Sequence, residues 1–161
     1  MELFISEYGR LIIFFHVISA VIWVGGMIAI RLAVHPSLQK ITDLKIRIPR
    51  TLEVMKRLFM FMIPVVFLLL LTALLLVVGF DFKHNDPALH SVALAKEAIW
   101  TIMTANLIMM IIRRKKAEKA FYLQQNDVML KHMTLISKYM LPVNILLGVI
   151  AIYLGIVLRG F

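Results

Sequence analysis

Three ionisable residues, His16, Lys96 and Glu97, interrupt stretches of the sequence that are otherwise apolar. An ionisable group surrounded by hydrocarbon is costly, so a residue of this kind usually binds something or carries protons. Neutral imidazole is a common ligand of haem iron and of copper. His16 is therefore a candidate haem ligand, a candidate copper ligand, or a side chain that is hydrogen-bonded to another helix.

Lys96 and Glu97 are neighbours in the chain and also admit more than one interpretation. The Lys96 ammonium can bind a carboxylate of a substrate or cofactor. Alternatively, its aliphatic stem can carry the charge out to the membrane interface. Glu97 can pair with groups near Lys96 or relay protons.

Four helices are needed to position these residues, and uncharged runs locate them. Residues 11–30, 58–80 and 139–158 contain no Asp, Glu, Lys or Arg, and about 20 helical residues cross a hydrocarbon core of about 30 Å. Residues 92–112 are predicted to form a fourth span, the alternative being a buried or interfacial helix. The sequence thus predicts an all-α, polytopic four-helix bundle in a single membrane domain, 1–161, with helices at approximately 8–34, 54–80, 92–122 and 132–158.

Positive charge gathers in two of the connections. The chain has 18 Lys and Arg against 9 Asp and Glu, a net charge of +9, yet 61% of it is hydrophobic. Residues 31–57 and 113–138 each hold seven Lys or Arg, so the positive-inside rule places both segments in the cytoplasm and both termini outside. We interpret the run 113–116 as a stop-transfer cluster that faces lipid headgroups.

The same numbers exclude several classes of protein. The basic charge is explained by membrane topology, so we expect a lipid bilayer and no nucleic acid as partner. The absence of cysteine excludes disulfides, thiolate-ligated iron–sulfur clusters and covalent haem attachment. The 11 methionines are scattered along the chain, which is typical of packing residues rather than of a copper site.

Helical spacing predicts that His16 and Lys96 share one depth. Each lies about five residues, roughly 8 Å, below the outer end of its helix, and a tryptophan, Trp23 or Trp100, follows on the same face. The face of His16 is rich in small residues, which suit close helix packing or a flat cofactor. Such residues permit a homodimer as readily as packing within one monomer.

Part of the first predicted helix resembles that of HemJ-type bacterial protoporphyrinogen oxidases and of the related CopD-like membrane proteins. The matching residues are His16, Trp23, Gly25, Gly26, Arg31 and His35. Later segments are similar as well: residues 53–58 with Pro64 resemble the start of helix two, residues 94–96 the lysine-bearing opening of helix three, and Pro142 the proline that opens the last helix. Where HemJ proteins usually carry a second histidine in helix three, this chain has Asn106.

The resemblance implies a protein of the bacterial inner (cytoplasmic) membrane that binds haem b, with His16 as an axial ligand. Trp23, Arg31 and Lys96 are the further cofactor-binding residues that it implies, and the second axial ligand stays open among Lys96, Met103 and His90. By depth, Arg31 lies across the membrane from Lys96, so the two cannot hold the same carboxylate.

The activity that the resemblance implies is oxidation of protoporphyrinogen IX, a porphyrin substrate, to protoporphyrin IX, with electrons passed to an acceptor in the respiratory chain. A CopD-like protein that handles copper in the membrane is one alternative. A non-catalytic subunit of a larger membrane complex is the other. The sequence identifies no catalytic residue.

Overall fold

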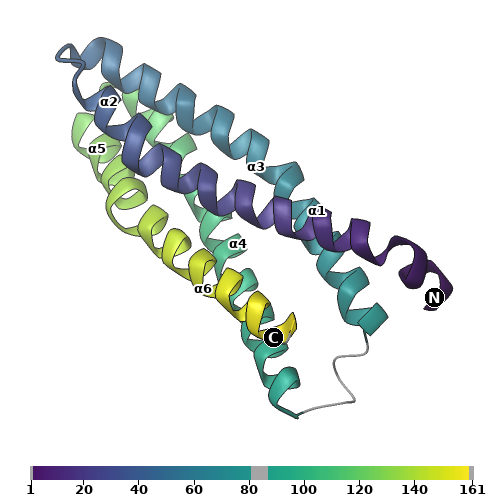
Figure 1. Ribbon diagram of the computed structural model, residues 1–161. Helices are drawn as coiled ribbons and strands as arrows, with labels where there is room; N and C mark the ends of the chain where they lie inside the picture. Colours follow the sequence, from purple (N-terminus) through teal and green to yellow (C-terminus); the bar gives the residue numbers. More distant parts are fainter. Residues whose placement is uncertain (1, 81–86, 160–161) are drawn as a thin grey trace.

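The computed structural model describes the backbone of residues 2–80 and 87–159, and the side chains of residues 7–78 and 90–157. All regular structure in these ranges is helical, as predicted (Figure 1). The elements are α1 (Glu2–Ala29), η1 (Ile30–Val34), α2 (His35–Gln39), α3 (Leu44–Phe80), α4 (Pro87–Tyr122), α5 (Asn126–Leu135), η2 (Ile136–Met140) and α6 (Leu141–Arg159). They join into four long rods, each long and apolar enough to cross a membrane.

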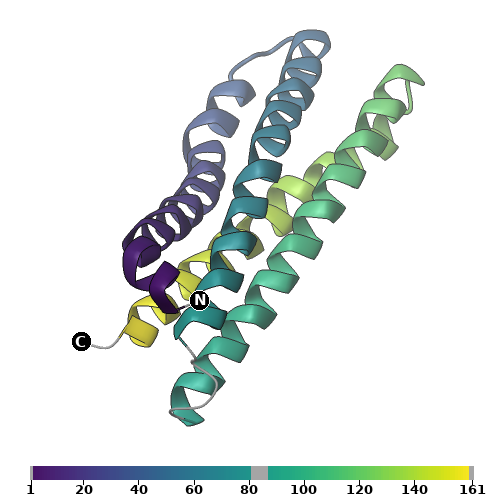
Figure 2. The ribbon, with the colours of Figure 1, turned by 90° about the vertical axis from the view of Figure 1, so that its right-hand side faces the viewer.

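The four rods form a bundle whose two ends differ. The start of α1, the end of α6, the end of α3 and the start of α4 lie at one end, and α2, the start of α3 and α5 lie at the other (Figures 1 and 2). Rod α1 packs against α3 and α6, and α4 packs against α5, α6 and α3. The two Lys- and Arg-rich segments both fall at the end that contains α2 and α5, which we call the basic end.

The packing is that of a membrane bundle, with apolar residues both inside and outside. The interior is filled by Trp23, Met27, Met62, Met110 and their neighbours. Large apolar side chains also cover the outer surface, where Phe67 is 66% and Leu146 is 62% exposed. An all-round apolar helix suits a bilayer, because hydrocarbon surrounds the exposed face. The buried methionines fill the core, as predicted for packing residues.

The helices extend further at the basic end than the sequence indicated. Helix α3 begins at Leu44 rather than near residue 54, because Asp43 caps it by accepting a 2.8 Å hydrogen bond from the Lys45 backbone N–H. A second buried cluster, made of Ile48, Leu52, Ala117, Ala120 and Met129, then packs the added turns of α3 against α4 and α5. Residues 81–86 of the predicted outer loop lie outside the described part of the chain.

Two five-residue π-helical segments, η1 and η2, interrupt the first and last rods at the basic end. Each is closed by a backbone bond that spans five residues, from His35 N–H to the Ile30 carbonyl and from Leu141 N–H to the Ile136 carbonyl. A proline, Pro36 or Pro142, stands two residues after the end of each segment. A proline ring collides with the carbonyl four residues before it, and a widened turn relieves that collision.

Candidate functional site

His16 is held by a polar contact between two helices. It lies on α1, and its Nδ1 is 3.1 Å from Oγ1 of Thr72 on α3. The single proton of the Thr72 hydroxyl is donated to the carbonyls of Leu68 (2.8 Å) and Leu69 (3.0 Å) in its own helix. With the hydroxyl proton directed to these carbonyls, Oγ1 accepts a hydrogen bond from the His16 Nδ1–H. In this tautomer Nε2 carries the lone pair, which is the form that ligates metal.

Lys96 reaches from α4 across to α6. Its Nζ lies against Gly155, where an added Cβ would be only 3.1 Å away. The side chain is half-buried, and among the described residues no carboxylate lies within ion-pair distance of it. A partly desolvated cation without a counter-ion attracts an anionic group.

The two residues lie at a similar level, as their depth predicted. Lys96 lies within electrostatic range of His16. The His16–Thr72 pair on α1 and α3 and the Lys96–Gly155 pair on α4 and α6 thus occupy one level of the bundle. We call this set the His16–Lys96 site.

Three buried polar atoms on the bundle interior have no hydrogen-bond partner within the described residues. They are Nε1 of Trp23, Nε1 of Trp100 and Oγ1 of Thr104. On α4, Trp100 follows Lys96 by one turn, and Thr104 follows Trp100 by one more. Buried polar groups of this kind are normally satisfied. Trp100 lies one turn from Lys96, whereas Trp23 and Thr104 lie about two turns below the His16–Lys96 site.

The predicted helix faces are partly confirmed. On α1, Ser19, Trp23 and Met27 continue the His16 face and are all buried. On α4, Met103 and Leu107 are buried below Lys96, whereas Glu97 is exposed on the outside of the bundle. Within the described ranges Glu97 forms no ion pair, so it does not compensate the charge of Lys96.

Asn106, which stands where HemJ proteins usually have a histidine, forms a structural contact. Its Nδ2 donates to the Met140 carbonyl (2.8 Å) and to Oδ1 of Asn144 (2.7 Å). Asn144 is completely buried and donates in turn to the Met103 carbonyl at 3.1 Å. These bonds join α4 to η2 and α6 in the middle of the bundle, a use of amides typical of membrane interiors.

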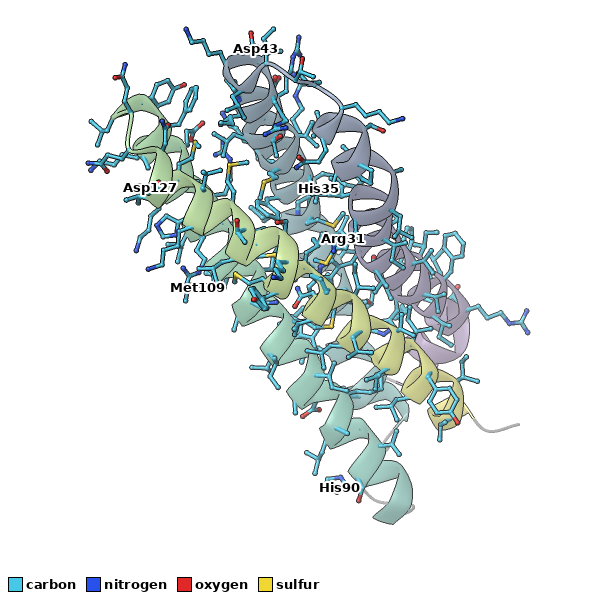
Figure 3. The ribbon with its side chains drawn as sticks, turned by 90° about the vertical axis from the view of Figure 1, so that its left-hand side faces the viewer. Arg31, His35, Asp43, His90, Met109 and Asp127 are labelled. Carbon is cyan, nitrogen blue, oxygen red and sulfur yellow. The ribbon has the colours of Figure 1, made fainter. Side chains whose placement is uncertain are left out.

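The three candidates for a second axial ligand occupy different levels of α4. His90 lies six residues before Lys96, about 9 Å along the axis, and Met103 lies seven residues after it, about 10.5 Å. Figure 3 shows His90 near the α4 terminus, far from Arg31. Of the three, Lys96 is the one at the level of His16. No group of three or more His, Asp or Glu that could share a metal ion occurs in the described part of the chain.

Arg31 belongs to a different place. It lies in η1, 15 residues or about 22 Å along the helix from His16, and lines a cavity at the basic end together with His35 and Arg47. Figure 3 shows Arg31 and His35 in the space between the first rod and the last. The structure therefore separates Arg31 from Lys96, as the depth argument predicted.

The roles of two polar residues could not be predicted from the sequence. Thr72 stands out as a polar residue in a long apolar run, but its contact with His16 depends on how α1 and α3 pack. Arg114 was assigned to the headgroup-facing cluster 113–116, and for this residue the assignment is wrong. The residue is 5% exposed, its Nε donates to the Leu52 carbonyl at 3.1 Å, and its Nη2 pairs with Glu118 at 2.7 Å.

Comparison with known proteins adds no relative. No protein-family model, curated protein or solved structure matches the chain significantly. The likeness to HemJ-type and CopD-like proteins therefore rests on the quoted motifs, and the functional argument rests on the geometry of the His16–Lys96 site.

Proposed function

We propose that the chain is an integral-membrane redox protein that binds haem b, with His16 Nε2 as the axial ligand of the iron. The observation that carries this proposal is the His16–Thr72 contact. The contact directs the His16 Nδ1–H to the Thr72 hydroxyl and leaves the lone pair of Nε2 available to bind iron, inside a span that is otherwise uncharged. Haem-ligating and zinc-ligating imidazoles characteristically donate their other N–H in this way, which orients the ring and raises its basicity.

The other residues of the site fit the chemistry of haem. Lys96 offers an unpaired cation for a propionate carboxylate, and such a pair is strengthened where water is scarce. It is also the nearest of the candidates for the second ligand. The unsatisfied indole N–H groups of Trp23 and Trp100 offer further donors to a polar group in the interior. When bound, haem supplies one-electron chemistry that no side chain here provides.

We further propose an orientation with both termini outside and the basic end in the cytoplasm, in a bacterial inner membrane. The support is the concentration of Lys and Arg at one end of the bundle. His16 and Lys96 then lie in the outer half of the bilayer. The matching motifs of the first and third helices support oxidation of protoporphyrinogen as the reaction.

The visible spectrum of the protein purified in detergent tests the haem assignment. We expect a Soret band and, after reduction with dithionite, the α and β bands of a b-type haem, released by acid acetone because no cysteine holds it. A colourless protein that binds Cu(I) contradicts the proposal in favour of copper. A colourless protein that binds neither contradicts it in favour of a structural subunit.

The reaction requires its own test. Expression in a strain that lacks protoporphyrinogen oxidase should restore growth without added haem. If the purified protein contains haem but the strain is not rescued, the oxidase assignment is wrong while the haem assignment stands.

A further inference from the structure

The cavity at the basic end is a second place in the molecule that is built to hold a ligand. It has a volume of about 150 Å³ and lies between η1 and α2, the start of α3, and α5 with η2. Two arginines and a histidine line it, Arg31, His35 and Arg47, and no Asp or Glu does. Its lining is therefore electropositive, at the end of the bundle where the apolar run 11–30 stops.

The two guanidinium groups of this cavity lack ionic partners. Glu53 on α3 pairs instead with Arg57 at 2.6 Å and with Arg50 at 3.9 Å, and Asp43, one turn before Arg47, caps α3. Neither Arg31 nor Arg47 forms an ion pair with any described residue, and both are half-buried. Two partly desolvated cations that share a cavity repel each other, and an anion between them removes that repulsion.

Most of the remaining lining is apolar, and its polar members are Gln39, Thr51, Thr134 and Ser137. Leu58, Phe59, Met133 and Leu141 form much of the wall, and this surface continues into the membrane-spanning part of the bundle. A ligand that satisfies both parts needs an anionic head and a hydrocarbon tail. The volume is small beside the roughly 300–1,000 Å³ of sites for drug-sized molecules, so the cavity suits a phosphate and its first carbons rather than a tetrapyrrole.

The shape of the cavity depends on the two π-helical segments. Both η1 and η2 contribute lining residues, among them Arg31 and Ser137. One extra residue in a turn rotates everything after it by about 100°, so the widened turns set which side chains face inward. Pro36 and Pro142, which favour these widened turns, therefore influence the shape of the same cavity.

We propose that this cavity binds the phosphate head of an anionic phospholipid, with the start of an acyl chain on the apolar wall. The guanidinium fork matches two phosphate oxygens at once. Basic pockets between transmembrane helices at headgroup level are suited to anionic lipids. The proposal is independent of haem, because the cavity lies at the opposite end of the first rod from His16.

The test uses the full-length protein, titrated with phosphatidylglycerol in a neutral detergent and examined by native mass spectrometry for retained lipid. Arg31→Gln and Arg47→Gln should each weaken retention about fivefold, and the double variant about thirtyfold. Lys115→Gln/Lys116→Gln removes the same two charges at exposed positions of this end and should leave retention unchanged. Equal retention by all variants, or none by the wild type, overturns the proposal.

Two further experiments test whether the lipid binds in this cavity and whether its acyl chain contributes to binding. Ser137→Leu fills the cavity without a change in charge and should also abolish retention, with the helix content by circular dichroism unchanged. Retention by Ser137→Leu at the wild-type level would show that the lipid binds elsewhere. Millimolar inorganic phosphate should not displace the lipid, because the free ion gains nothing from the apolar wall. If phosphate displaces it, the site is a general phosphate site and the lipid assignment is wrong.

Discussion

Gly148 on α6 packs directly against Val24 of α1, and this contact makes a sharp prediction for Gly148→Ala. An added Cβ would overlap Cγ2 of Val24 and lie 3.2 Å from Cε of Met103. The methionine end can swing away, but Val24 is β-branched and has one favoured rotamer in a helix. Because carbon atoms pack best at about 3.5–4.0 Å, α1 must retreat from α6 by about 1 Å.

The expected magnitude comes from comparison with Gly25→Ala. Nothing lies within 4 Å of a Cβ at Gly25, so that substitution only gains the helix preference of alanine over glycine, about 1 kcal/mol. Gly148→Ala gains the same preference but must also relieve an overpacked contact, which costs about 1–3 kcal/mol. The difference between the two variants isolates the contact, so we expect Gly148→Ala to be less stable than Gly25→Ala by about 1–3 kcal/mol.

Unfolding by SDS in mixed micelles, followed by tryptophan fluorescence and circular dichroism, measures this difference. Trp23 is buried in the core and Trp100 packs against it, partly buried, so both report the opening of the bundle. In a Val24→Ala background the obstacle is removed, and Gly148→Ala should then behave like Gly25→Ala. Equal stability of the two single variants, or no effect of Val24→Ala on their difference, would refute the predicted contact between α1 and α6.

Three other substitutions test separate contacts. Thr72→Val should weaken haem affinity, measured by haem titration, about 10–100-fold, because it removes the hydrogen-bond acceptor of His16. Thr101→Val loses only an intrahelical bond at an exposed position and should leave the affinity unchanged. Asn144→Ala should destabilise the bundle by about 0.6–1.7 kcal/mol in the SDS assay, since it breaks the amide bonds between α4 and α6, and a stability equal to wild type would count against that network. Arg114→Met should lower the free energy of unfolding by about 1–3 kcal/mol, because the Leu52 carbonyl and the Glu118 carboxylate lose their partner. Lys115→Met is the exposed control and should be neutral. Identical melting of the two variants would contradict the burial of Arg114.

The spans and the shared level of His16 and Lys96 were predictable because they depend on local properties. An uncharged run of about 20 residues has few alternatives to a membrane helix, and a fixed rise per residue converts sequence position into depth. The same rule predicted the separation of Arg31 from Lys96. The rule does not predict that α3 begins as early as Leu44, because the first turns of α3 are stabilised by a cap and by packing against α4 and α5.

Other features depend on tertiary contacts that leave no pattern in the sequence. Thr72 gains its role only when α1 lies beside α3, and Arg114 differs from its basic neighbours only in the direction it faces. The π-helical segments have a visible cause in Pro36 and Pro142, yet a proline can also kink or end a helix. That both widened turns line one cavity follows only from the antiparallel packing of the first and last rods.

The most direct test of the haem assignment is the visible spectrum of His16→Ala beside that of the wild type, each recorded before and after addition of imidazole. We predict that the substitution removes the Soret band or shifts it to that of a loosely bound haem, and that imidazole restores the wild-type spectrum by taking the place of the missing side chain. His132→Ala, a histidine on α5 at the basic end, should leave the spectrum unchanged. A His16→Ala protein with the full haem content and an unaltered spectrum would contradict the account.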